Sequence, residues 1–341
     1  MAESKFEPRQ IYKSTFPYSG CKEQQLRFLL KYAILAPSHY NTQPWTFRID
    51  PEGIDVLQNI SRGASFVDPH LRELTISCGA AIRMVEVAAR YFLNMPSVLF
   101  PTNNQGNHLA RMELSNSYEP SAEDILLFNA IKQRQTNRGW FTSADIPNNV
   151  LESCHAAAEE LGVALAFTSE RVLKESFAVL TASAVRQQQS MPWYRLEFSS
   201  WLRSPLSYKS DGVTGFGFFA SCIPLPLMET TIKWLDRGKQ IGDFNRKKII
   251  SGSPIFAVIS TDSDTKENWT NTGRLLSHLL LALTTAGLSA SFMNQAIEVS
   301  ELRKQVSSLF DCGANPQLIL RIGVAQEVHW TSRMPVDDCL I

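Results

Sequence analysis

The sequence predicts an α+β fold with two pseudo-symmetric lobes, each built on a mixed, mainly antiparallel sheet flanked by helices. Three observations support this class. The chain has 341 residues, of which 44% are hydrophobic and 19% charged, which is typical of a globular protein with a sizeable core. The order strand, long apolar helix, strand, strand occurs twice. Each copy contains one long apolar helix, and we expect the two lobes to pack through these helices.

The first lobe is expected to span residues 1–120. Apolar residues at helical spacing predict a helix over 24–36. Strands are predicted over 45–49 and 54–57, with Gly53 in the turn between them. Asp68 is predicted to cap the next helix, with Pro69 at its first position, and this helix continues to about Phe92. Strands over 97–100 and 109–114 complete the lobe.

The second lobe is expected to span residues 121–341. Helices are predicted over 122–133 and 149–161, followed by a strand over 163–167. Residues 254–260 suit a central strand, and 274–286 predict a buried helix that ends at Gly287. Strands over 288–293 and 317–324 enclose a helix over 299–310. Direct residue identity between the lobes is low, so their equivalence depends on the order of the elements.

One segment, 190–238, interrupts the second lobe. It is rich in Ser, Pro, Trp and Phe, and contains the run DGVTGFGFF that begins at Asp211. A connection of this length inside a compact protein is usually functional, and often a lid. Gly212, Gly215 and Gly217 would give such a lid backbone freedom. The alternative is an ordinary helical excursion packed on the surface.

Composition excludes several classes of protein. The 33 basic and 33 acidic residues balance, so neither a nucleic acid nor a membrane is expected as a partner. The 6 cysteines lack metal-ligand spacing, which predicts reduced, mostly buried thiols and no metal site. With no apolar leader and no apolar run of membrane length, the expected location is the cytoplasm. A dinucleotide GxGxxG loop, a P-loop and a GxSxG serine elbow are also absent from the sequence.

The most specific feature is the sequence APSHYNTQPW at positions 36–45. Pro37 ends the preceding helix, and Ser38 and Asn41 place short polar groups on the loop that follows. Gln43 can both donate and accept hydrogen bonds. A polar loop with amide side chains suits a flat heterocycle with alternating donors and acceptors, although a simple capped turn has the same composition.

A second feature is the sequence RQTNR at positions 134–138. Arg134 and Arg138 can converge on a phosphate through charge and the fork geometry of the guanidinium group, and Thr136 adds a hydroxyl. A solvated helix end is the alternative for this motif taken alone.

Together the two motifs resemble those of the FMN-dependent nitroreductase superfamily. The pattern APSxxNxQPW is similar to its flavin-ring loop, and RxTNRxxF, ending at Phe141, is similar to its phosphate-binding start. The segments 244–248, 293–295 and 331–335 resemble further flavin contacts. The resemblance thus implies a nitroreductase-like fold and a set of FMN-binding residues: Pro37, Ser38, Asn41, Gln43, Arg134, Gln135, Thr136, Arg138, Asn245, Lys248, Met293, Asn294, Gln295 and Arg333. Within that set, Asn245 and Lys248 are implied at the pyrimidine edge of the flavin.

The distribution of these motifs along the chain implies a single site. The first lobe carries the ring loop but no RxSxR-like start, and the second carries the phosphate start but no ring loop. This resembles a fused, degenerate dimer, as in the Acg-type branch of the superfamily. The segment 68–80 resembles a characteristic segment of that branch. The chain is therefore expected to be a monomer with an internal pseudo-dimer, or a weak homodimer.

Some positions depart from the family pattern or have two interpretations. Asn294 and Gln295 replace a common Glu-Gly pair, and Thr331 replaces a basic residue two positions before Arg333, which puts the tuning of the flavin in question. His39 could donate to a substrate or to the flavin, or be a solvent-facing loop residue. Asp68 and Arg72 could orient the ring loop, or be a helix cap and a surface arginine. His278, within an apolar helix, is predicted to be a hydrogen-bonded core histidine.

The resemblance implies an NAD(P)H-dependent FMN oxidoreductase with a ping-pong reaction. NAD(P)H would reduce the flavin at N5, and a small-molecule acceptor such as a nitroaromatic or a quinone would then be reduced. The flavin carries this chemistry, so no catalytic side chain is implied. The alternative is a protein that sequesters FMN beneath the lid with little turnover.

Overall fold

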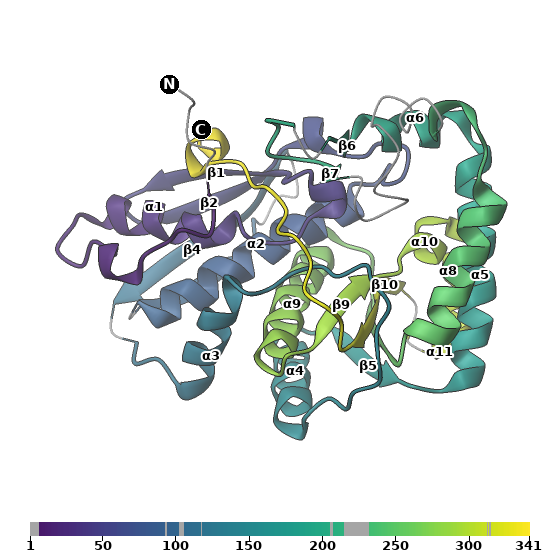
Figure 1. Ribbon diagram of the computed structural model, residues 1–341. Coiled ribbons are helices and arrows are strands. Elements are labelled where there is room, and N and C mark those ends of the chain that lie inside the picture. Colours follow the sequence, from purple (N-terminus) through teal and green to yellow (C-terminus); the bar gives the residue numbers. More distant parts are fainter. Residues whose placement is uncertain are drawn as a thin grey trace.

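Two four-stranded sheets and the helices around them form the computed structural model (Figure 1). The structure describes residues 7–92, 94–101, 106–116, 118–204, 207–214, 232–311, 313 and 315–341. The α+β class predicted from the sequence is confirmed by these sheets and helices.

The first sheet is formed by residues of the first lobe. Its strands are β1 (Trp45–Asp50), β2 (Gly53–Gln58), β3 (Asn94–Leu99) and β4 (His108–Asn116), in the order β1-β2-β4-β3 with antiparallel pairing throughout. The helices α1 (Lys22–Ala33), α2 (Arg72–Tyr91) and α3 (Ala122–Ile131) accompany it. Every strand predicted in this lobe is present.

The second sheet repeats this order with later residues. Its strands are β5 (Ala164–Thr168), β8 (Ile255–Thr261), β9 (Ser289–Phe292) and β10 (Asn315–Gly323), in the order β5-β8-β10-β9. The predicted central strand, β8, is indeed internal. The helices α4 (Asn148–Glu160), α9 (Lys266–Thr285), α10 (Gln295–Glu298) and α11 (Ser300–Phe310) belong to this half. In both sheets the strands therefore follow the order first, second, fourth, third.

Each sheet also gains a short parallel contact at an edge. Leu340 bridges Phe47 of β1, and Thr136 bridges Ala290 of β9. The main ladders are antiparallel and these edge bridges are parallel, which agrees with the expectation of mixed, mainly antiparallel sheets. Neither Thr136 nor Leu340 belongs to a strand of the sheet that it bridges.

The long buried helices α2 and α9 cross at two glycines. A Cβ atom on Gly79 would overlap the carbonyl oxygen of Thr270, and one on Gly273 would overlap the carbonyl oxygen of Ile76. The backbones of the two helices are thus in direct contact. As predicted, the two halves pack through these helices, and their apolar side chains form part of one continuous core.

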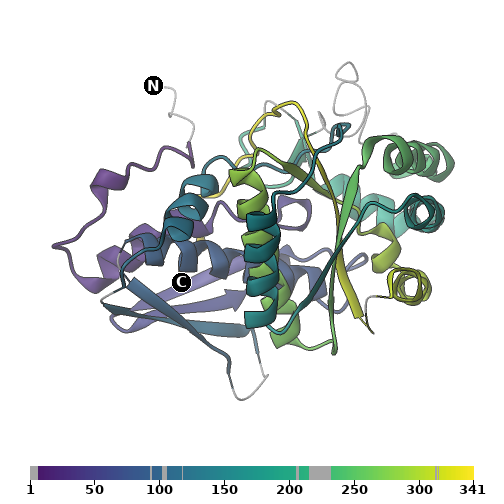
Figure 2. The same cartoon turned by 90° about the horizontal axis from the view of Figure 1, so that it is seen from below.

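Two long helices were not predicted. These are α5 (Arg171–Ser190) and α8 (Gly238–Gly252), which lie with α11 beyond the second sheet, where Figure 2 shows the three end-on. Phe177, Ile249 and Val306 of these helices pack with Phe256 of β8 in a second apolar cluster. The second sheet is consequently covered on both faces.

The start of α2 differs from the prediction. The helix begins at Arg72 and follows Leu71 in the left-handed region with φ 59°, so Pro69 precedes it rather than occupying its first turn. Asp68 still satisfies a helix donor, because its Oδ2 accepts from the backbone N–H of Leu74 at 2.9 Å. The prediction that Asp68 is the residue directly before the helix was wrong, because Leu71 holds that position. The Asp68 carboxylate instead accepts the hydrogen bond from further back in the preceding loop.

Part of the 190–238 segment is described. It contains α6 (Pro192–Ser200) and the short parallel strands β6 (Leu202–Arg203) and β7 (Val213–Thr214). The ion pair between Arg62 and Asp211 ties it to the first lobe at 2.6 Å. Gly215 and Gly217, two of the glycines singled out in the sequence, lie outside the described residues.

Among the cysteines, Cys78, Cys154 and Cys339 are buried free thiols and Cys21 is an exposed one, while Cys222 and Cys312 lie outside the described residues. Over the part of the chain that is described, no helix combines the length and the apolar character needed to cross a bilayer.

Candidate functional site

One pocket of about 1120 Å³, including its open mouth, collects residues from both halves of the chain. The ring loop, the RQTNR segment, the start of α10 and the segment around Arg333 all reach it. The predicted cofactor residues that line it are Pro37, Ser38, Asn41, Arg134, Gln135, Thr136, Arg138, Asn294, Gln295 and Arg333. Motifs far apart in the sequence are thus brought together at one place.

The ring loop has an unusual backbone. Tyr40, Asn41 and Gln43 adopt positive φ values of 47°, 55° and 51°. Positive φ is costly for residues other than glycine and persists only where the surroundings impose it. Ser38 contributes, because its Oγ accepts from the backbone N–H of Gln43 at 3.0 Å. The loop is therefore held in one strained shape at the edge of the pocket.

The two amide side chains of the loop connect it by hydrogen bonds to two distant segments of the chain, around residues 210–212 and 332–334. Asn41 lines the pocket, but its Nδ2 donates to the carbonyl oxygens of Gly212 and Ser332, both at 3.2 Å. Gln43 is fully buried and does not line the pocket. Its Nε2 donates to the carbonyl of Ser210 at 2.8 Å, and its Oε1 accepts from the N–H of Met334 at 2.8 Å. In this structure Gln43 thus fixes the loop and does not face the pocket.

Arginines gather at one end of the pocket. Arg134 and Arg333 are 2% and 3% exposed, which rules out the solvated helix end considered for Arg134. The Nη2 atoms of both donate to the carbonyl of Leu35, at 3.2 and 3.5 Å. Arg9, from the N-terminal segment, also lines the pocket and stacks on the ring of Trp330 at 4.0 Å. Arg138 also lines the pocket, and its charge acts on Lys248 and Arg321.

These charges are poorly compensated. Among the described residues no carboxylate forms an ion pair with Arg134 or Arg333, and Nε and Nη1 of Arg134 and Nε of Arg333 have no hydrogen-bond partner. Burial and the charge of Arg9 lower the pKa of Arg134 to about 9, and burial with Arg134 and Arg9 lowers that of Arg333 further. An arginine stays charged at neutral pH, so the cost of burial remains. The donor set fits a phosphate group.

The other end of the pocket suits an aromatic heterocycle. Ile76, Leu276, Phe292 and Leu318 provide apolar walls. Gln295 offers a buried Oε1 that has no partner among the described residues. An apolar slot with a few fixed polar groups is the usual form of a cofactor site. Asn294 is less available, because its Oδ1 accepts from the N–H of Ile319 at 3.1 Å.

Besides Gln43, three residues implied by the resemblance lie outside the pocket lining. Met293 is buried in the second apolar cluster. Asn245 and Lys248 are on α8, which packs against α5. Lys248 donates to the carbonyl of Arg138 at 2.9 Å, and burial together with Arg321 and Arg138 lowers its pKa to about 8. Lys248 therefore supports a residue of the pocket from behind.

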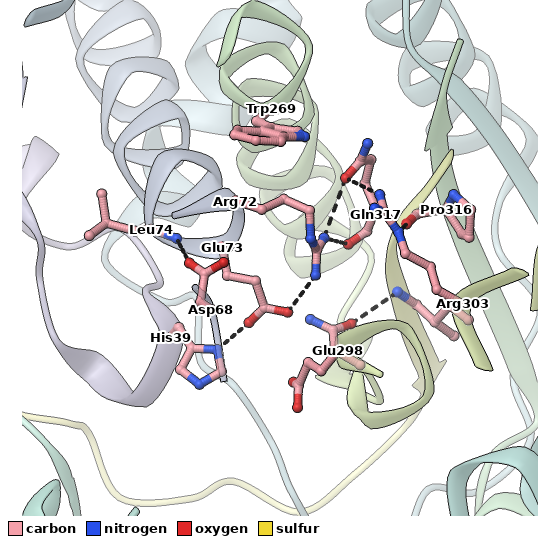
Figure 3. A network of polar contacts seen from close by, with 12 residues as sticks. His39, Asp68, Arg72, Glu73, Leu74, Trp269, Glu298, Arg303, Pro316 and Gln317 are labelled. Carbon is pink, nitrogen blue, oxygen red and sulfur yellow. Dashed lines mark hydrogen bonds and ion pairs between the residues drawn. The ribbon is translucent and has the colours of Figure 1, made fainter. Parts of the chain in front are cut away.

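A buried polar network adjoins the pocket (Figure 3). Nδ1 of His39 is bonded to Oε2 of Glu73, whose Oε1 accepts from Arg72 at 2.9 Å. Arg72 also donates to the carbonyl of Gln317 at 2.5 Å. The interpretations of His39 as a solvent-facing residue and of Arg72 as a surface arginine are wrong, because both side chains are largely buried.

His278 behaves as predicted. It is 3% exposed within α9, its Nδ1 meets Nη2 of Arg83 at 2.9 Å, and its Nε2 meets Oγ of Ser153 at 2.8 Å. It is a hydrogen-bonded core histidine between helices α2, α9 and α4.

The pocket residues missed from the sequence include Arg9, Glu73, Glu298 and Trp330. Arg9 lies in a segment that the family resemblance did not cover. Glu73 and Glu298 are single acidic residues at a helix start and a helix end, and no local spacing distinguishes them from surface carboxylates.

No family model matches the chain. Among curated proteins, it is 26% identical over 304 residues to "Putative NAD(P)H nitroreductase Rv3131" of Mycobacterium tuberculosis, covering 89% of this chain and 86% of that protein. It is 26% identical over 336 residues to "Putative NAD(P)H nitroreductase acg" of the same organism, covering 92% and 94%. Among solved structures, an FMN- and NADPH-dependent nitroreductase NfnB from a Sphingopyxis strain matches 62% of this chain and 96% of its own, with a TM-score of 0.40 and 15% identity.

The curated relatives match about nine tenths of the chain. The chain is thus similar over most of its length to proteins named as putative NAD(P)H nitroreductases, which supports its resemblance to the nitroreductase superfamily.

Proposed function

We propose that the protein is an FMN-dependent oxidoreductase that passes reducing equivalents from NAD(P)H to a nitroaromatic or quinone acceptor in a ping-pong reaction. The observation that carries the proposal is the pair of buried, carboxylate-free arginines, Arg134 and Arg333, at one end of a pocket whose other end is apolar. A flat ring joined to a phosphate satisfies both ends at once.

Particular residues would hold each part of the cofactor. Arg134, Arg138 and Arg333 would bind the phosphate, with Arg9 adding charge and Thr136 a hydroxyl. Pro37 and Ser38 of the ring loop, with Asn294 and Gln295, would border the ring. When bound, FMN supplies the hydride-accepting and hydride-donating chemistry, and the protein supplies position and electrostatics.

A single site per chain follows from the same arrangement. The two sheets have one strand order, which supports an internal pseudo-dimer. The ring loop comes from the first half, whereas Arg134, Arg138 and Arg333 come from the second. We therefore propose one FMN per chain and a protein that works as a monomer or a weak homodimer.

A second candidate function is FMN sequestration with little turnover. Its support is the attachment of the 190–238 segment to the ring loop, through the bonds from Asn41 to Gly212 and from Gln43 to Ser210. The Arg62–Asp211 ion pair adds to this attachment. A segment fixed to this loop is positioned to restrict access to a bound flavin.

The test is anaerobic reduction of the purified, flavin-loaded protein. Stopped-flow absorbance would follow bleaching of the flavin by NADH and by NADPH, and then its reoxidation by a nitroaromatic or a quinone. We expect bleaching with at least one nicotinamide and recovery with the acceptor. If the protein binds FMN but neither NADH nor NADPH bleaches the flavin, the sequestering function replaces the oxidoreductase function. Protein that binds no FMN would overturn both.

A further inference from the structure

His39 presents an unsatisfied nitrogen to the pocket. Its Nδ1 is bonded to Glu73, whereas its Nε2 is buried and has no hydrogen-bond partner among the described residues. Burial lowers the pKa of His39, but the Glu73 carboxylate outweighs this and raises it to about 9. The ring is then an imidazolium at neutral pH, and Nε2 carries a proton. A buried charged donor without an acceptor is costly, which indicates that a ligand supplies the acceptor.

The position of this donor is fixed on several sides. The backbone N–H of His39 donates to Oγ of Ser77 at 3.2 Å. Glu73 is held in turn by Arg72, so the imidazolium, carboxylate and guanidinium form a continuous row (Figure 3). A donor supported in this way keeps its direction when a ligand binds.

Glu298 lies opposite this donor at the end of α10 and also lines the pocket. Its Oε2 accepts from Nε2 of Gln188 at 2.6 Å. One ligating atom from each of His39, Glu73 and Glu298 lies within 4.8 Å of those of the other two. Burial and the charge of Glu73 raise the pKa of Glu298 above its ordinary value. This carboxyl therefore retains its proton to a higher pH than an exposed glutamate does.

Charged and titratable groups surround Glu298 from three elements. Those facing it are His39 and Tyr40 of the ring loop, Arg72 and Glu73 of α2, and Tyr194 of α6. Asp68 acts on the same cluster through His39. Because positive and negative groups are both present, deprotonation of Glu298 adds one uncompensated negative charge to a buried site.

We propose that His39 and Glu298 form an oxygen-binding, proton-donating pair for the acceptor that is reduced in this pocket. Nε2–H of His39 donates a hydrogen bond to an oxygen of a nitro or quinone group, and the carboxyl of Glu298 supplies the proton that this oxygen needs. The proposal rests on the proposed oxidoreductase function for its source of hydride, which is the reduced nicotinamide dinucleotide.

The proton balance is simplest for a quinone. A quinone that receives a hydride gains two electrons and one proton and becomes a hydroquinone monoanion. Glu298 then breaks its O–H bond and gives the proton to the anionic oxygen, which yields the neutral hydroquinone and a carboxylate. Bulk water returns a proton to the carboxylate. The imidazolium of His39 stabilises the negative charge before this transfer.

A divalent cation is a weaker explanation for the same cluster. Both oxygens of Glu73 already accept hydrogen bonds, one from His39 and one from Arg72. This leaves Nε2 of His39 and one oxygen of Glu298 as free ligands, beside the positive charge of Arg72. Two ligands next to an arginine do not make a favourable cation site.

The first test needs no reduction. Nitrobenzene is titrated into the oxidised protein without nicotinamide, and the imidazole signals of ¹⁵N-histidine are followed by NMR across the acidic and neutral range. His39 is assigned by comparison with the His39→Gln variant. We expect the His39 signal to shift, with an affinity that falls about tenfold per pH unit once Glu298 loses its proton. Glu298→Gln should keep the tighter, acidic affinity at every pH, whereas Glu298→Asp should retain the pH dependence.

The matched control is Glu301→Gln, an exposed glutamate three residues further along, which should behave like the wild type. If Glu298→Gln shows the same pH dependence as the wild type, or if nitrobenzene leaves the His39 signal unmoved, the pair does not bind the acceptor.

A second, kinetic test separates this proposal from the proposed function. With a tetramethyl-substituted quinone, Glu298→Gln should slow reoxidation of the reduced protein about a hundredfold. Reduction by NAD(P)H, which takes no proton from Glu298, should slow far less. Equal reoxidation rates in variant and wild type would overturn the proton-donating role while the oxidoreductase function stands. If NAD(P)H reduces neither protein, the oxidoreductase function fails, and the NMR titration still decides whether the pair binds an oxygen acceptor.

Discussion

Gly79 of α2 and Gly273 of α9 face one another reciprocally: each lies against the carbonyl oxygen of the residue three positions before the other. The two helices have the same length, 20 residues, and each glycine is preceded by seven helical residues, 72–78 and 266–272. A reciprocal contact of this kind is what a twofold axis between two identical helices produces. It supports an origin of the chain from two copies of one unit.

Replacing either glycine should destabilise the protein strongly. Gly79→Ala or Gly273→Ala would place a methyl group against a backbone carbonyl, and we expect the free energy of unfolding to fall by about 1–3 kcal/mol or more, as in overpacked cores. Urea unfolding measures this. Gly139→Ala, at an exposed glycine whose added Cβ meets only the side chain of Asn137, is the control. Equal stability of all three variants would show that the helices can separate freely.

The flavin content should be about one FMN per chain, because the ring loop and the RQTNR segment each occur once in the sequence and both line the same pocket. Acid-released flavin, quantified by absorbance against protein concentration, gives the ratio. A ratio near two would contradict the single-site interpretation and require a second phosphate site in the first lobe.

Removing an arginine should weaken FMN binding without unfolding the apoprotein. Arg134→Ala and Arg333→Ala each delete a charge-assisted phosphate contact worth roughly 1.5–3 kcal/mol, and each ~1.4 kcal/mol corresponds to tenfold in the dissociation constant. Because these charges are buried without a carboxylate partner, the apoprotein should lose little stability. Titration of apo variants with FMN tests affinity, and Arg171→Ala, at an exposed arginine of α5, is the control. Wild-type affinity in both variants would place the phosphate elsewhere.

Stability should decrease as the pH falls below neutrality, partly through His278. Burial, and then the charge of Arg83, lower its folded-state pKa to about 3, whereas the unfolded chain has a histidine pKa of about 6.5. Between these values the unfolded state takes up a proton that the folded state excludes. His278 therefore lowers the free energy of unfolding by up to about 1.4 kcal/mol for each pH unit of acidification in this range.

The corresponding variant is His278→Gln, which should be less stable at neutral pH but show a shallower loss of stability on acidification. Urea midpoints at neutral and mildly acidic pH provide the measurement. His155→Gln, an exposed histidine of α4, should keep the wild-type slope. An unchanged slope in His278→Gln would mean that other groups cause the acid sensitivity.

Loosening the 190–238 segment should speed up flavin chemistry. Asp211 pairs with Arg62 of the first lobe at 2.6 Å and with Arg203 of its own segment at 2.9 Å, so Asp211→Asn weakens the link to the first lobe and a contact that orders the segment itself. We expect faster reduction by NAD(P)H and faster release of FMN, both measured by stopped flow. Asp262→Asn, at an exposed aspartate, is the control. Unchanged rates in Asp211→Asn would show that the segment does not limit access.

The sequence predicts the strands better than the helices. Strands such as β8 are short apolar runs with clear ends, whereas α9 begins at Lys266, well before the apolar run that starts at Arg274. Its first turns are polar and are capped by the side chain of Thr265, which accepts from the N–H of Asn268. The helices α5 and α8 were missed because one face of each is polar and α8 contains Gly242 and Gly252.

The pocket is partly predictable because its motifs are local. The ring loop and the RQTNR segment were both identified from the sequence. Their spacing does not show, however, which of their polar side chains face the pocket and which bind other parts of the protein. Gln43 satisfies backbone groups, and Glu298 enters the pocket from α10, a four-residue helix. Such assignments depend on contacts between residues far apart in the sequence, for example Arg333 and Leu35.

The bond between Arg333 and the carbonyl of Leu35, and the bridge from Leu340 back to Phe47, have a consequence for biosynthesis. The strands of the first sheet are all made before residue 117, so that sheet can assemble while the ribosome is still translating the second half. The pocket cannot, because one of its walls is made some three hundred residues after the other. Cofactor capture is therefore confined to a chain that has emerged at least as far as Arg333. A nascent or prematurely terminated chain would carry a folded sheet and an open, arginine-poor half-site.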